Sequence, residues 1–179
     1  MPYLNFIDFP VLNTKRLALR RITEADDKAI FKLRSNDAIN LYIDRPTEKK
    51  ISETQDFIVK INNGINENKW LYWVLCLKES HTLIGTVCLW NLSEDELSAE
   101  IGYELSPDFH GKGFMDEALG AIINHCFTKL NLEMLCAYTH HENTGSRNLL
   151  EKNKFKIDVN KHDTENINNL IYILTADQS

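Results

Sequence analysis

The sequence predicts a mixed α/β fold of the α+β kind, in which helices cover both faces of a mostly antiparallel central sheet. Two strongly β-forming runs, at 70–78 and 83–91, are joined by a short polar turn. Segments with apolar residues at helical spacing stand before and after them in the chain. A third β-forming run, Ser98–Leu105, leads through a glycine turn into another amphipathic helix. Since no repeat or linker interrupts the chain, residues 1–179 are expected to form one domain.

Composition and charge narrow the class of protein. The contents of hydrophobic residues (43%) and charged residues (26%) are those of a globular protein. A net charge of −6 argues against a surface that coats nucleic acid, but it suits a basic substrate. No apolar run reaches the roughly 20 residues that span a bilayer, and the N-terminus lacks the pattern of a signal peptide. We therefore expect a cytoplasmic monomer or homodimer that binds neither nucleic acid nor membrane.

Neither the cysteines nor the one pair of adjacent histidines has the sequence pattern of a metal site. The cysteines stand in apolar stretches and never as a C-x-x-C pair, so they are expected to be free thiols in a reducing compartment. His140 and His141 are adjacent at the end of a predicted strand, where side chains are expected to point apart. No carboxylate stands near them at metal-ligand spacing, so no metal site is expected.

The first half of the chain is predicted as strand, helix, loop and helix. Apolar alternation predicts a strand within 12–22. Thr23, with an aspartate three positions on, predicts the cap of the next helix. Residues 35–47 are predicted as a loop or short helix. A second helix is expected over 52–66, with Ser52 as its cap.

The second half of the chain alternates between strands and helices. Beyond Ser98–Leu105, the pattern predicts a helix from about Gly113, a strand over 134–139, a helix over 143–152, and two closing strands over 155–159 and 170–175. The sheet is expected to open beside the strand at 134–139.

The glycine turn, HGKG at 110–113, is the most informative local motif. Gly111 and Gly113 let the backbone approach a bulky anion, and the helix that follows presents unpaired N–H groups at its positive end. A diphosphate suits such a turn. The same pattern also fits an ordinary strand-to-helix turn that binds nothing, and Lys112 is either a phosphate contact or a solvated side chain.

Four segments carry patterns that occur together and in this order in one enzyme superfamily. They are LALRRITEADDKAIFKL (17–33), EIGYEL (100–105), HGKGFMDEAL (110–119) and ENTGSRNLLEKNKF (142–155). Together they resemble the GNAT superfamily of acyl-CoA N-acyltransferases, and within it the Rim-type branch, the ribosomal-protein N-terminal acetyltransferases. The resemblance covers residues 10–176. It implies a GNAT-like domain that uses acetyl-CoA as co-substrate and an amine as acceptor, either a protein N-terminus such as that of a ribosomal protein or a small amine.

The chain departs from the family pattern at four positions. His110 stands where the family usually has Gln or Arg, and Met115 stands where it has Gly or Ala. Because the coenzyme is held there mainly by main-chain N–H groups, Met115 is expected to point into the core. Leu150 replaces a tyrosine that often protonates the departing thiol, and Lys154 replaces a glycine at the exit of the late helix.

The resemblance also implies which residues hold the coenzyme. For the diphosphate they are His110, Gly111, Lys112, Gly113, Phe114, Met115 and Asp116. For the pantetheine arm they are the backbone of Leu105 and the side chain of Asn143.

Acetyl transfer to an amine requires a base for the amine and a proton for the leaving thiolate. Glu100 and Glu104 lie four residues apart on one strand, so both are expected on the same face. The alternation of side chains along the strand does not decide whether these two carboxylates act in catalysis or are only solvated. The resemblance favours Glu100 as the base, with Glu104 second, and implies Ser146 as the proton donor. The alternative role for Ser146 or Asn143 is a helix cap.

The reaction is expected to proceed by direct attack in a ternary complex. No cysteine stands beside the turn with a basic partner, so no acetyl-enzyme is expected. Two other functions stay open: a non-catalytic acyl-CoA-binding sensor on the same fold, and a nucleotide-binding domain. Glu100 and Ser146 argue against the sensor, and the nucleotide loop would need G-x-x-x-x-G-K-[ST]. The acceptor pocket is assigned to 35–66 and 161–169, with one of three tryptophans as a wall, but no motif there identifies the substrate.

Overall fold

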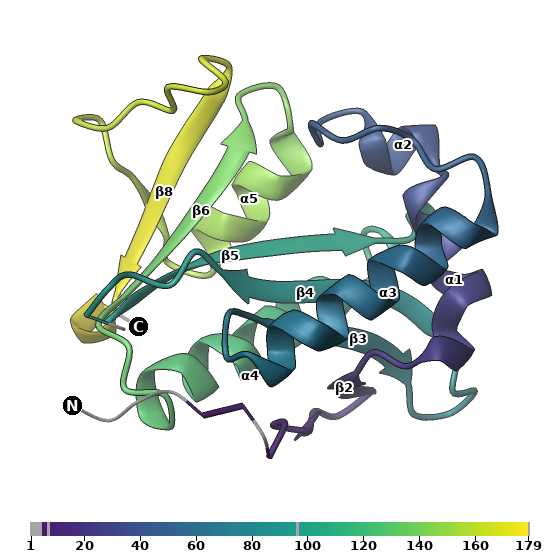
Figure 1. Ribbon diagram of the computed structural model, residues 1–179. Coiled ribbons are helices and arrows are strands. Elements are labelled where there is room, and N and C mark those ends of the chain that lie inside the picture. Colours follow the sequence, from purple (N-terminus) through teal and green to yellow (C-terminus); the bar gives the residue numbers. More distant parts are fainter. Residues whose placement is uncertain (1–4, 7, 96, 179) are drawn as a thin grey trace.

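The chain folds around one eight-stranded sheet with helices packed against it (Figure 1). This computed structural model describes residues 5–6, 8–95 and 97–178, and the other positions of the expected 1–179 domain lie outside the described residues. The spatial order of the strands is β1-β2-β3-β4-β5-β6-β8-β7. Only β5 and β6 pair in parallel, and all other neighbours are antiparallel. The predicted mixed, mostly antiparallel sheet is confirmed.

The strands are β1 (Leu12–Asn13), β2 (Leu17–Arg21), β3 (Leu71–Leu77), β4 (Leu83–Trp90), β5 (Ser98–Leu105), β6 (Met134–His140), β7 (Lys156–Ile157) and β8 (Asn169–Thr175). The α-helices are α1 (Asp27–Arg34), α2 (Asp37–Asn40), α3 (Ile51–Asn66), α4 (Phe114–Thr128) and α5 (Thr144–Lys152).

Two neighbouring residues of β3 show that helices cover both faces of the sheet. The Phe57 ring of α3 packs edge-on against Tyr72, with ring centroids 5.7 Å apart. The His125 ring of α4 packs edge-on against Trp73, with centroids 6.4 Å apart. Because successive side chains of a strand point to opposite faces, α3 and α4 lie on opposite sides of the sheet. This burial on both faces explains why β3 is a continuous apolar run.

The strand predicted over 12–22 is divided into β1 and β2. A turn separates them, closed by the Thr14 N–H, which donates to the Leu17 carbonyl at 2.9 Å. The turn directs Thr14 and Arg16 toward α4, where the Thr14 hydroxyl and the Arg16 N–H both donate to the Glu117 carboxylate, at 2.5 and 2.7 Å. The alternation of apolar residues carries no sign of this long-range contact. The sequence pattern therefore predicts one continuous strand where the structure has two.

The helix caps agree with the prediction in one case and differ in another. The capping box of Thr23 and Asp26 is confirmed, with the Thr23 N–H donating to the Asp26 carboxylate at 2.8 Å. The prediction of Ser52 as a cap is wrong. Lys50 is the N-cap of α3, and the Glu53 carboxylate accepts its N–H at 3.0 Å, so Ser52 lies inside the helix. Within 35–47, which is predicted as a loop or short helix, Asp37–Asn40 form the short helix α2.

The parallel pair β5–β6 is short and then divides. Pairing covers three residues of each strand and ends at Glu100 and Cys136. Beyond these residues β5 continues to Leu105 and β6 to His140 along diverging paths (Figure 1). We call this divergence the fork. The predicted opening of the sheet beside this strand is confirmed, whereas the strand predicted over 155–159 is reduced to β7.

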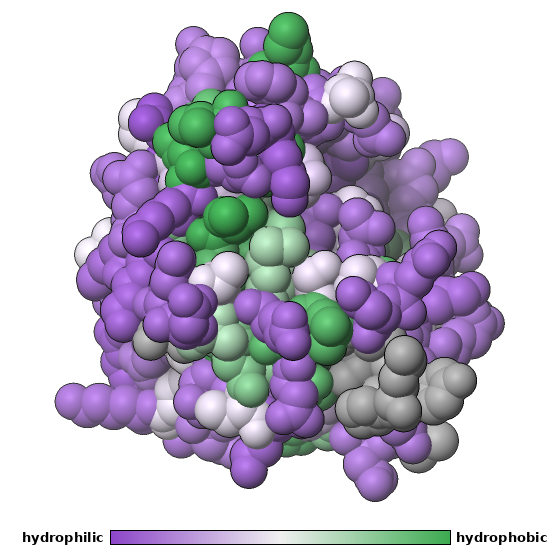
Figure 2. Space-filling model, turned by 90° about the vertical axis from the view of Figure 1, so that its left-hand side faces the viewer, coloured by the Kyte–Doolittle hydropathy of each residue, from purple (hydrophilic) through white to green (hydrophobic). Residues whose placement is uncertain are grey.

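The edge of the sheet that carries β8 and β7 exposes hydrophobic side chains. Figure 2 shows hydrophobic side chains gathered in a band on this side and framed by hydrophilic ones. Val159 and Ile167, in the segment between β7 and β8, are 76% and 91% exposed. In the described part of the chain, no helix has the length and apolar character needed to cross a membrane.

Candidate active site

The glycine turn forms the entry to α4. Gly111 and Gly113 both have positive φ, at 70° and 74°, and Gly113 is the N-cap of the helix. The Glu117 N–H donates to the Gly113 carbonyl at 3.1 Å, which is the i→i−4 hydrogen bond at the start of the helix. The N–H groups of the first helical turn, from Phe114 on, are therefore presented at the positive end of the helix.

The surroundings of the turn suit the close approach of an anion. Gly111 is exposed, and a Cβ placed on it would meet no atom within 4 Å. Its positive φ also disfavours any residue with a Cβ. Met115 is 5% exposed, so its side chain packs in the core as predicted, and its bulk leaves the outer surface of the turn open.

Arg16 lies beside the turn, a position that no local sequence pattern predicts. Its Nε donates to the Glu117 carboxylate at 2.6 Å, and its Nη1 donates to the Lys112 carbonyl at 2.9 Å. The guanidinium lies over the Phe114 ring, 4.2 Å from the centroid. Its Nη2 lies 3.6 Å from the position that a Cβ on Gly113 would take, so a cation borders the outer face of the turn.

Two predicted turn residues direct their side chains elsewhere. The Lys112 ammonium donates to the Asp108 carbonyl at 2.7 Å and remains exposed. The Asp116 carboxylate pairs with the Lys152 ammonium at 2.8 Å and accepts a hydrogen bond from the Asn153 amide at 3.0 Å. Asp116 thus ties α4 to the end of α5, and only its main chain belongs to the turn.

Leu105 ends β5, and its backbone faces the fork. The Ser106 N–H donates to the Ile84 carbonyl of β4 at 2.8 Å, and in an antiparallel pair the next residue directs its groups the opposite way. The Leu105 N–H and carbonyl therefore point away from β4. The carbonyl already has a partner, because the His110 Nε2 lies 2.9 Å from it, a hydrogen bond that requires the tautomer protonated at Nε2.

Glu100 lies where the fork begins. Its Cα is in register with Trp90 on β4 and with Cys136 on β6, and its side chain is half-buried. The pKa of the Glu100 carboxyl is raised to about 7, mainly by burial and in part by the nearby carboxylates of Asp163 and Glu165, against an opposing hydrogen bond with the Asn91 side chain. A carboxyl with this pKa exchanges protons near neutrality.

Glu104 has a different environment on the same strand. Its side chain is buried, and one carboxylate oxygen pairs with the Arg45 Nη2 at 2.6 Å. The Thr86 hydroxyl lies 3.4 Å from the other oxygen. The Arg45 Nε also donates to Asn40 of α2 at 2.9 Å, so Glu104 anchors the segment that follows α2.

Asn143 and Ser146 occupy the first turn of α5. Asn143 is the N-cap, and its Oδ1 accepts the Ser146 N–H at 3.1 Å. The cap alternative is therefore correct for Asn143 and wrong for Ser146. The Ser146 hydroxyl instead lies 2.8 Å from the Tyr103 hydroxyl of β5. Burial raises the pKa of Tyr103 to about 12.

The strand register assigns Glu100 and Tyr103 to opposite faces of the sheet. Tyr72, which faces α3, lies in register with Gly102 across β4. Trp73, which faces α4, lies in register with Tyr103. Because Glu100 is two residues from Gly102, it lies on the α3 face, while Tyr103 lies on the α4 face.

Aromatic side chains border Glu100 on the α3 face. Trp90, its neighbour in register, is 46% exposed, whereas Trp73 is buried. Tyr138, two residues beyond Cys136 on β6, is 41% exposed. Of the three tryptophans proposed for a pocket wall, Trp90 is the one that stands open beside Glu100.

The histidine pair at the end of β6 differs from the expectation. The rings of His140 and His141 stack, with centroids 4.6 Å apart, and the Tyr42 ring lies 5.3 Å from His140. The strand ends at His140, so strict side-chain alternation no longer applies to His141.

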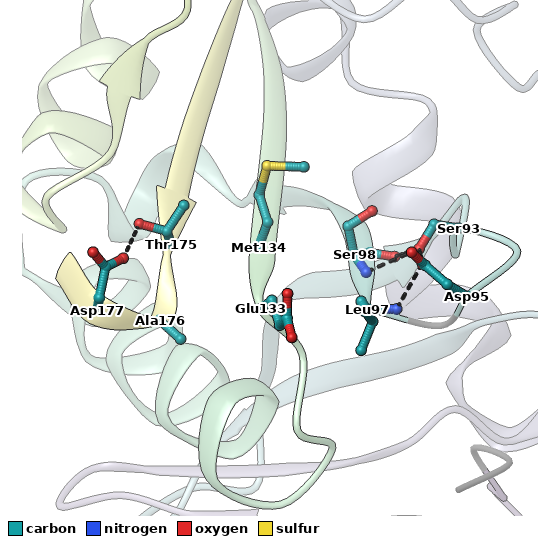
Figure 3. Close-up of a pocket in the computed structure, with 9 residues that line it drawn as sticks. All are labelled: Ser93, Asp95, Leu97, Ser98, Glu133, Met134, Thr175, Ala176 and Asp177. Atoms are coloured by element: carbon teal, nitrogen blue, oxygen red, sulfur yellow. Dashed lines mark hydrogen bonds between the residues drawn. The ribbon is translucent and has the colours of Figure 1, made fainter. Parts of the chain in front are cut away.

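A hollow of about 570 Å³ lies at the opposite end of β5 and β6, where the two strands are paired (Figure 3). It is lined by Ser93, Asp95, Leu97, Ser98, Glu133, Met134, Thr175, Ala176 and Asp177. None of the predicted site residues lines it. Within the ranges that the structure describes, no group of three or more His, Cys, Asp or Glu side chains could hold a metal ion.

Comparison with known proteins gives consistent matches. The family model described as the acetyltransferase (GNAT) domain matches residues 16–156. The uncharacterized N-acetyltransferase YoaA of Bacillus subtilis (strain 168) is 32% identical over 148 residues, which cover 83% of this chain and 84% of that protein. The uncharacterized N-acetyltransferase p20 of Bacillus licheniformis is 34% identical over 146 residues, which cover 81% and 82%.

Solved structures with the same fold include two Rim-type enzymes. RimL, a ribosomal L7/L12 alpha-N-protein acetyltransferase in complex with coenzyme A, superposes with a TM-score of 0.82 at 17% identity and covers 95% of this chain and 100% of that one. RimJ of Mycobacterium smegmatis, in complex with CoA-disulfide, gives 0.80 at 21% identity, with coverage of 93% and 87%. A GNAT-family acetyltransferase of Bacillus anthracis gives 0.81 at 20% identity, with coverage of 94% and 99%.

Proposed function

This chain belongs to the GNAT acetyltransferase family and is an N-acetyltransferase, and from that premise we propose that it acetylates a primary amine by direct attack in a ternary complex. The family resemblance found in the sequence is confirmed. One observation supports the mechanism above all: at the fork, a carboxyl with a pKa near neutrality and a pair of hydroxyls lie on opposite faces of the same strand, β5.

The described residues fit acetyl-CoA as co-substrate. The main-chain N–H groups between Gly111 and Asp116 and the Arg16 Nη2 would hold the diphosphate. The Leu105 N–H, directed into the fork, would hold the pantetheine arm. Asn143 would contribute only its amide nitrogen, since its oxygen caps α5.

On the α3 face, Glu100 would act as the base. Above its pKa of about 7 the carboxylate takes a proton from the attacking amine, directly or through one water, as the N–C bond forms. The carboxylates of Asp163 and Glu165 and the exposed rings of Trp90 and Tyr138 favour the approach of a cationic amine. Glu104 is the weaker candidate because it is buried in its ion pair with Arg45.

On the α4 face, Ser146 would supply the proton to the sulfur as the C–S bond breaks. The position at which many family members carry a tyrosine holds Leu150, which is fully buried. Leu150 cannot donate a proton, and Ser146 is the hydroxyl at the start of α5 that lies against β5 and could supply it.

Two features favour an enzyme over an acyl-CoA sensor. Glu100 has a pKa tuned to proton exchange, and it stands beside exposed aromatic rings that an acceptor can contact. For the acceptor we propose a protein N-terminus, such as that of a ribosomal protein, or a small amine. Release of CoA across a panel of N-terminal peptides and polyamines would distinguish these classes.

The coenzyme site is tested by a thermal shift. Acetyl-CoA is expected to raise the melting temperature, because it binds only the folded state. Gly113→Asp is expected to abolish this rise, since a carboxylate at this position would meet the Arg16 Nη2 and repel the diphosphate. Gly120→Asp is the matched control, because Gly120 lies on the same helix with no atom within 4 Å of an added Cβ. If the folded Gly113→Asp variant binds CoA as tightly as the control, the turn is not the coenzyme site.

A further inference from the structure

We propose that Tyr103 is a positioning residue that acts through Ser146, so that the proton for the leaving thiolate passes along a relay of two hydroxyls. The inference rests on the proposed function, since it concerns the same proton-transfer step. The sequence motifs do not include Tyr103 in a catalytic role, and Leu150 leaves the chain without the tyrosine that often provides this proton.

Three contacts fix the positions of the two hydroxyls. The hydroxyls of Tyr103 and Ser146 are 2.8 Å apart, and the phenol oxygen lies 3.5 Å from the Ser146 carbonyl. The Ser146 N–H is bound to the Asn143 cap, which fixes this first turn of α5. Tyr103 projects from β5, which is paired with β4 along its length. The two hydroxyls therefore join a rigid strand to a capped helix.

The hydrogen bond between the two hydroxyls can run in either direction, and the relay uses the one in which the phenol donates. A phenol is a stronger acid than an aliphatic hydroxyl, so it is the better donor. Burial raises the pKa of Tyr103 to about 12, which keeps the phenol protonated at every working pH. Either hydroxyl can donate in this pair, and for the relay we assign the donor role to Tyr103, which leaves the Ser146 proton to point at another acceptor.

The relay moves two protons while one bond forms and one breaks. As the amine nitrogen bonds to the acetyl carbon, the C–S bond breaks and its electron pair goes to sulfur. The Ser146 proton moves to that sulfur, and the Tyr103 proton moves to the Ser146 oxygen, so no alkoxide accumulates. The phenolate then recovers a proton from water, and the proton taken up by Glu100 returns to solvent. The products are the amide and the free thiol.

Tyr172 provides a matched control in the same region. Its hydroxyl donates to the Glu151 carboxylate at 2.8 Å and accepts from the Arg147 Nε at 3.4 Å. Tyr172 is fully buried, so Tyr172→Phe removes a buried phenolic hydrogen bond without touching Ser146.

The test compares steady-state kinetics of the wild type, Tyr103→Phe, Ser146→Ala, the double variant and Tyr172→Phe. The acceptor is spermidine or a free N-terminal peptide, whichever the wild type acetylates faster. Tyr103→Phe is expected to lower kcat about 10-fold, as Ser146→Ala does, with an unchanged KM for acetyl-CoA. The double variant is expected to be no slower than Ser146→Ala, because the two groups act as one unit. The solvent isotope effect on kcat is expected to fall in Tyr103→Phe and to persist in Tyr172→Phe.

Several outcomes would overturn the relay while leaving the proposed acetyl transfer to an amine in place. They are a normal kcat in Tyr103→Phe or Ser146→Ala, losses that multiply in the double variant, and an equal loss in Tyr172→Phe. A thermal melt of each variant separates lost chemistry from lost folding. A wild type that binds acetyl-CoA but releases no CoA with any amine would instead overturn the proposed function, and the relay with it.

Discussion

The two sides of the fork differ in whether main-chain or side-chain groups form them. On the side proposed to bind the coenzyme, two short continuous segments, 110–116 and 143–146, would supply mostly main-chain groups. On the side proposed to bind the acceptor, Glu100, Arg45 and the segment at 158–168 would supply side chains from distant parts of the chain. A site made of backbone tolerates unusual side chains, as Met115 shows by packing inward. A site made of side chains changes its chemistry with each substitution.

The charges on the two sides are also opposite. The turn offers the positive start of α4 and the Arg16 guanidinium, which is also ion-paired with the Glu117 carboxylate. Around Glu100 the nearby charges include the carboxylates of Asp163 and Glu165. An anionic diphosphate and a cationic amine would thus be attracted to opposite faces of one sheet. If the two sides act independently, removing a charge from one side should leave binding at the other side unchanged.

The largest effect is expected on the acceptor side, in Glu100→Gln. The amide keeps the shape of the side chain but cannot accept a proton, so turnover is expected to fall about 10²–10⁴-fold if the carboxylate is the sole base. The wild-type rate should rise with pH through about 7 as Glu100 ionises. The loss in the variant should shrink at higher pH, because more of the amine is already neutral. Rates of CoA release between pH 6 and 9.5 measure both, and the affinity for CoA should not change.

Glu133→Gln is the control for this prediction. It makes the same change of charge at the opposite end of the paired segment of β5 and β6, beside the hollow of Figure 3. Its rate is expected to match the wild type. A loss in Glu100→Gln that does not vary with pH would assign the carboxylate to positioning, and an unchanged rate would leave water or Glu104 as the base.

Local sequence patterns predicted the fold and the conformation of the glycine turn well, because their determinants are contiguous. The strand, the glycine turn and the start of α4 follow one another in the chain. Arg16 and Tyr103 were missed for the opposite reason. Arg16 reaches the turn only because a hairpin brings the start of β2 against Glu117, and Tyr103 meets Ser146 only across the fork. Neither contact leaves a periodic or local signature.

An intermediate effect is expected on the coenzyme side, in Arg16→Met. The variant keeps the packing of the side chain but removes the cation beside Gly113, so the affinity for CoA is expected to fall about 10- to 100-fold, as for one lost charge-assisted contact. The affinity for pantetheine, which has no phosphate, should not change. Calorimetric titration with both ligands measures the difference. Lys112→Met, which removes an exposed ammonium bonded to the Asp108 carbonyl, should have a smaller effect. Equal losses for CoA and pantetheine would mean that Arg16 only supports the fold.

The smallest effect is a gain of stability in the same Glu100→Gln variant that loses activity. Because burial raises the folded-state pKa of Glu100 to about 7, above its unfolded value, the neutral carboxyl is favoured in the folded protein at low pH. That contribution is lost as the pH rises toward 7, where the charged form must be held in a half-buried site. Glutamine never ionises, so the free energy of unfolding of the variant relative to wild type should increase from pH 5 to pH 8. The gain is expected to be on the order of 1 kcal/mol after allowance for solvent screening of the exposed part.

Urea unfolding at the two pH values measures this gain, with Glu79→Gln in an exposed turn as the control whose stability should not change. An equal effect of Glu100→Gln at both pH values would mean that the carboxyl has an ordinary pKa, and the base assigned to the acceptor side would lose its physical support.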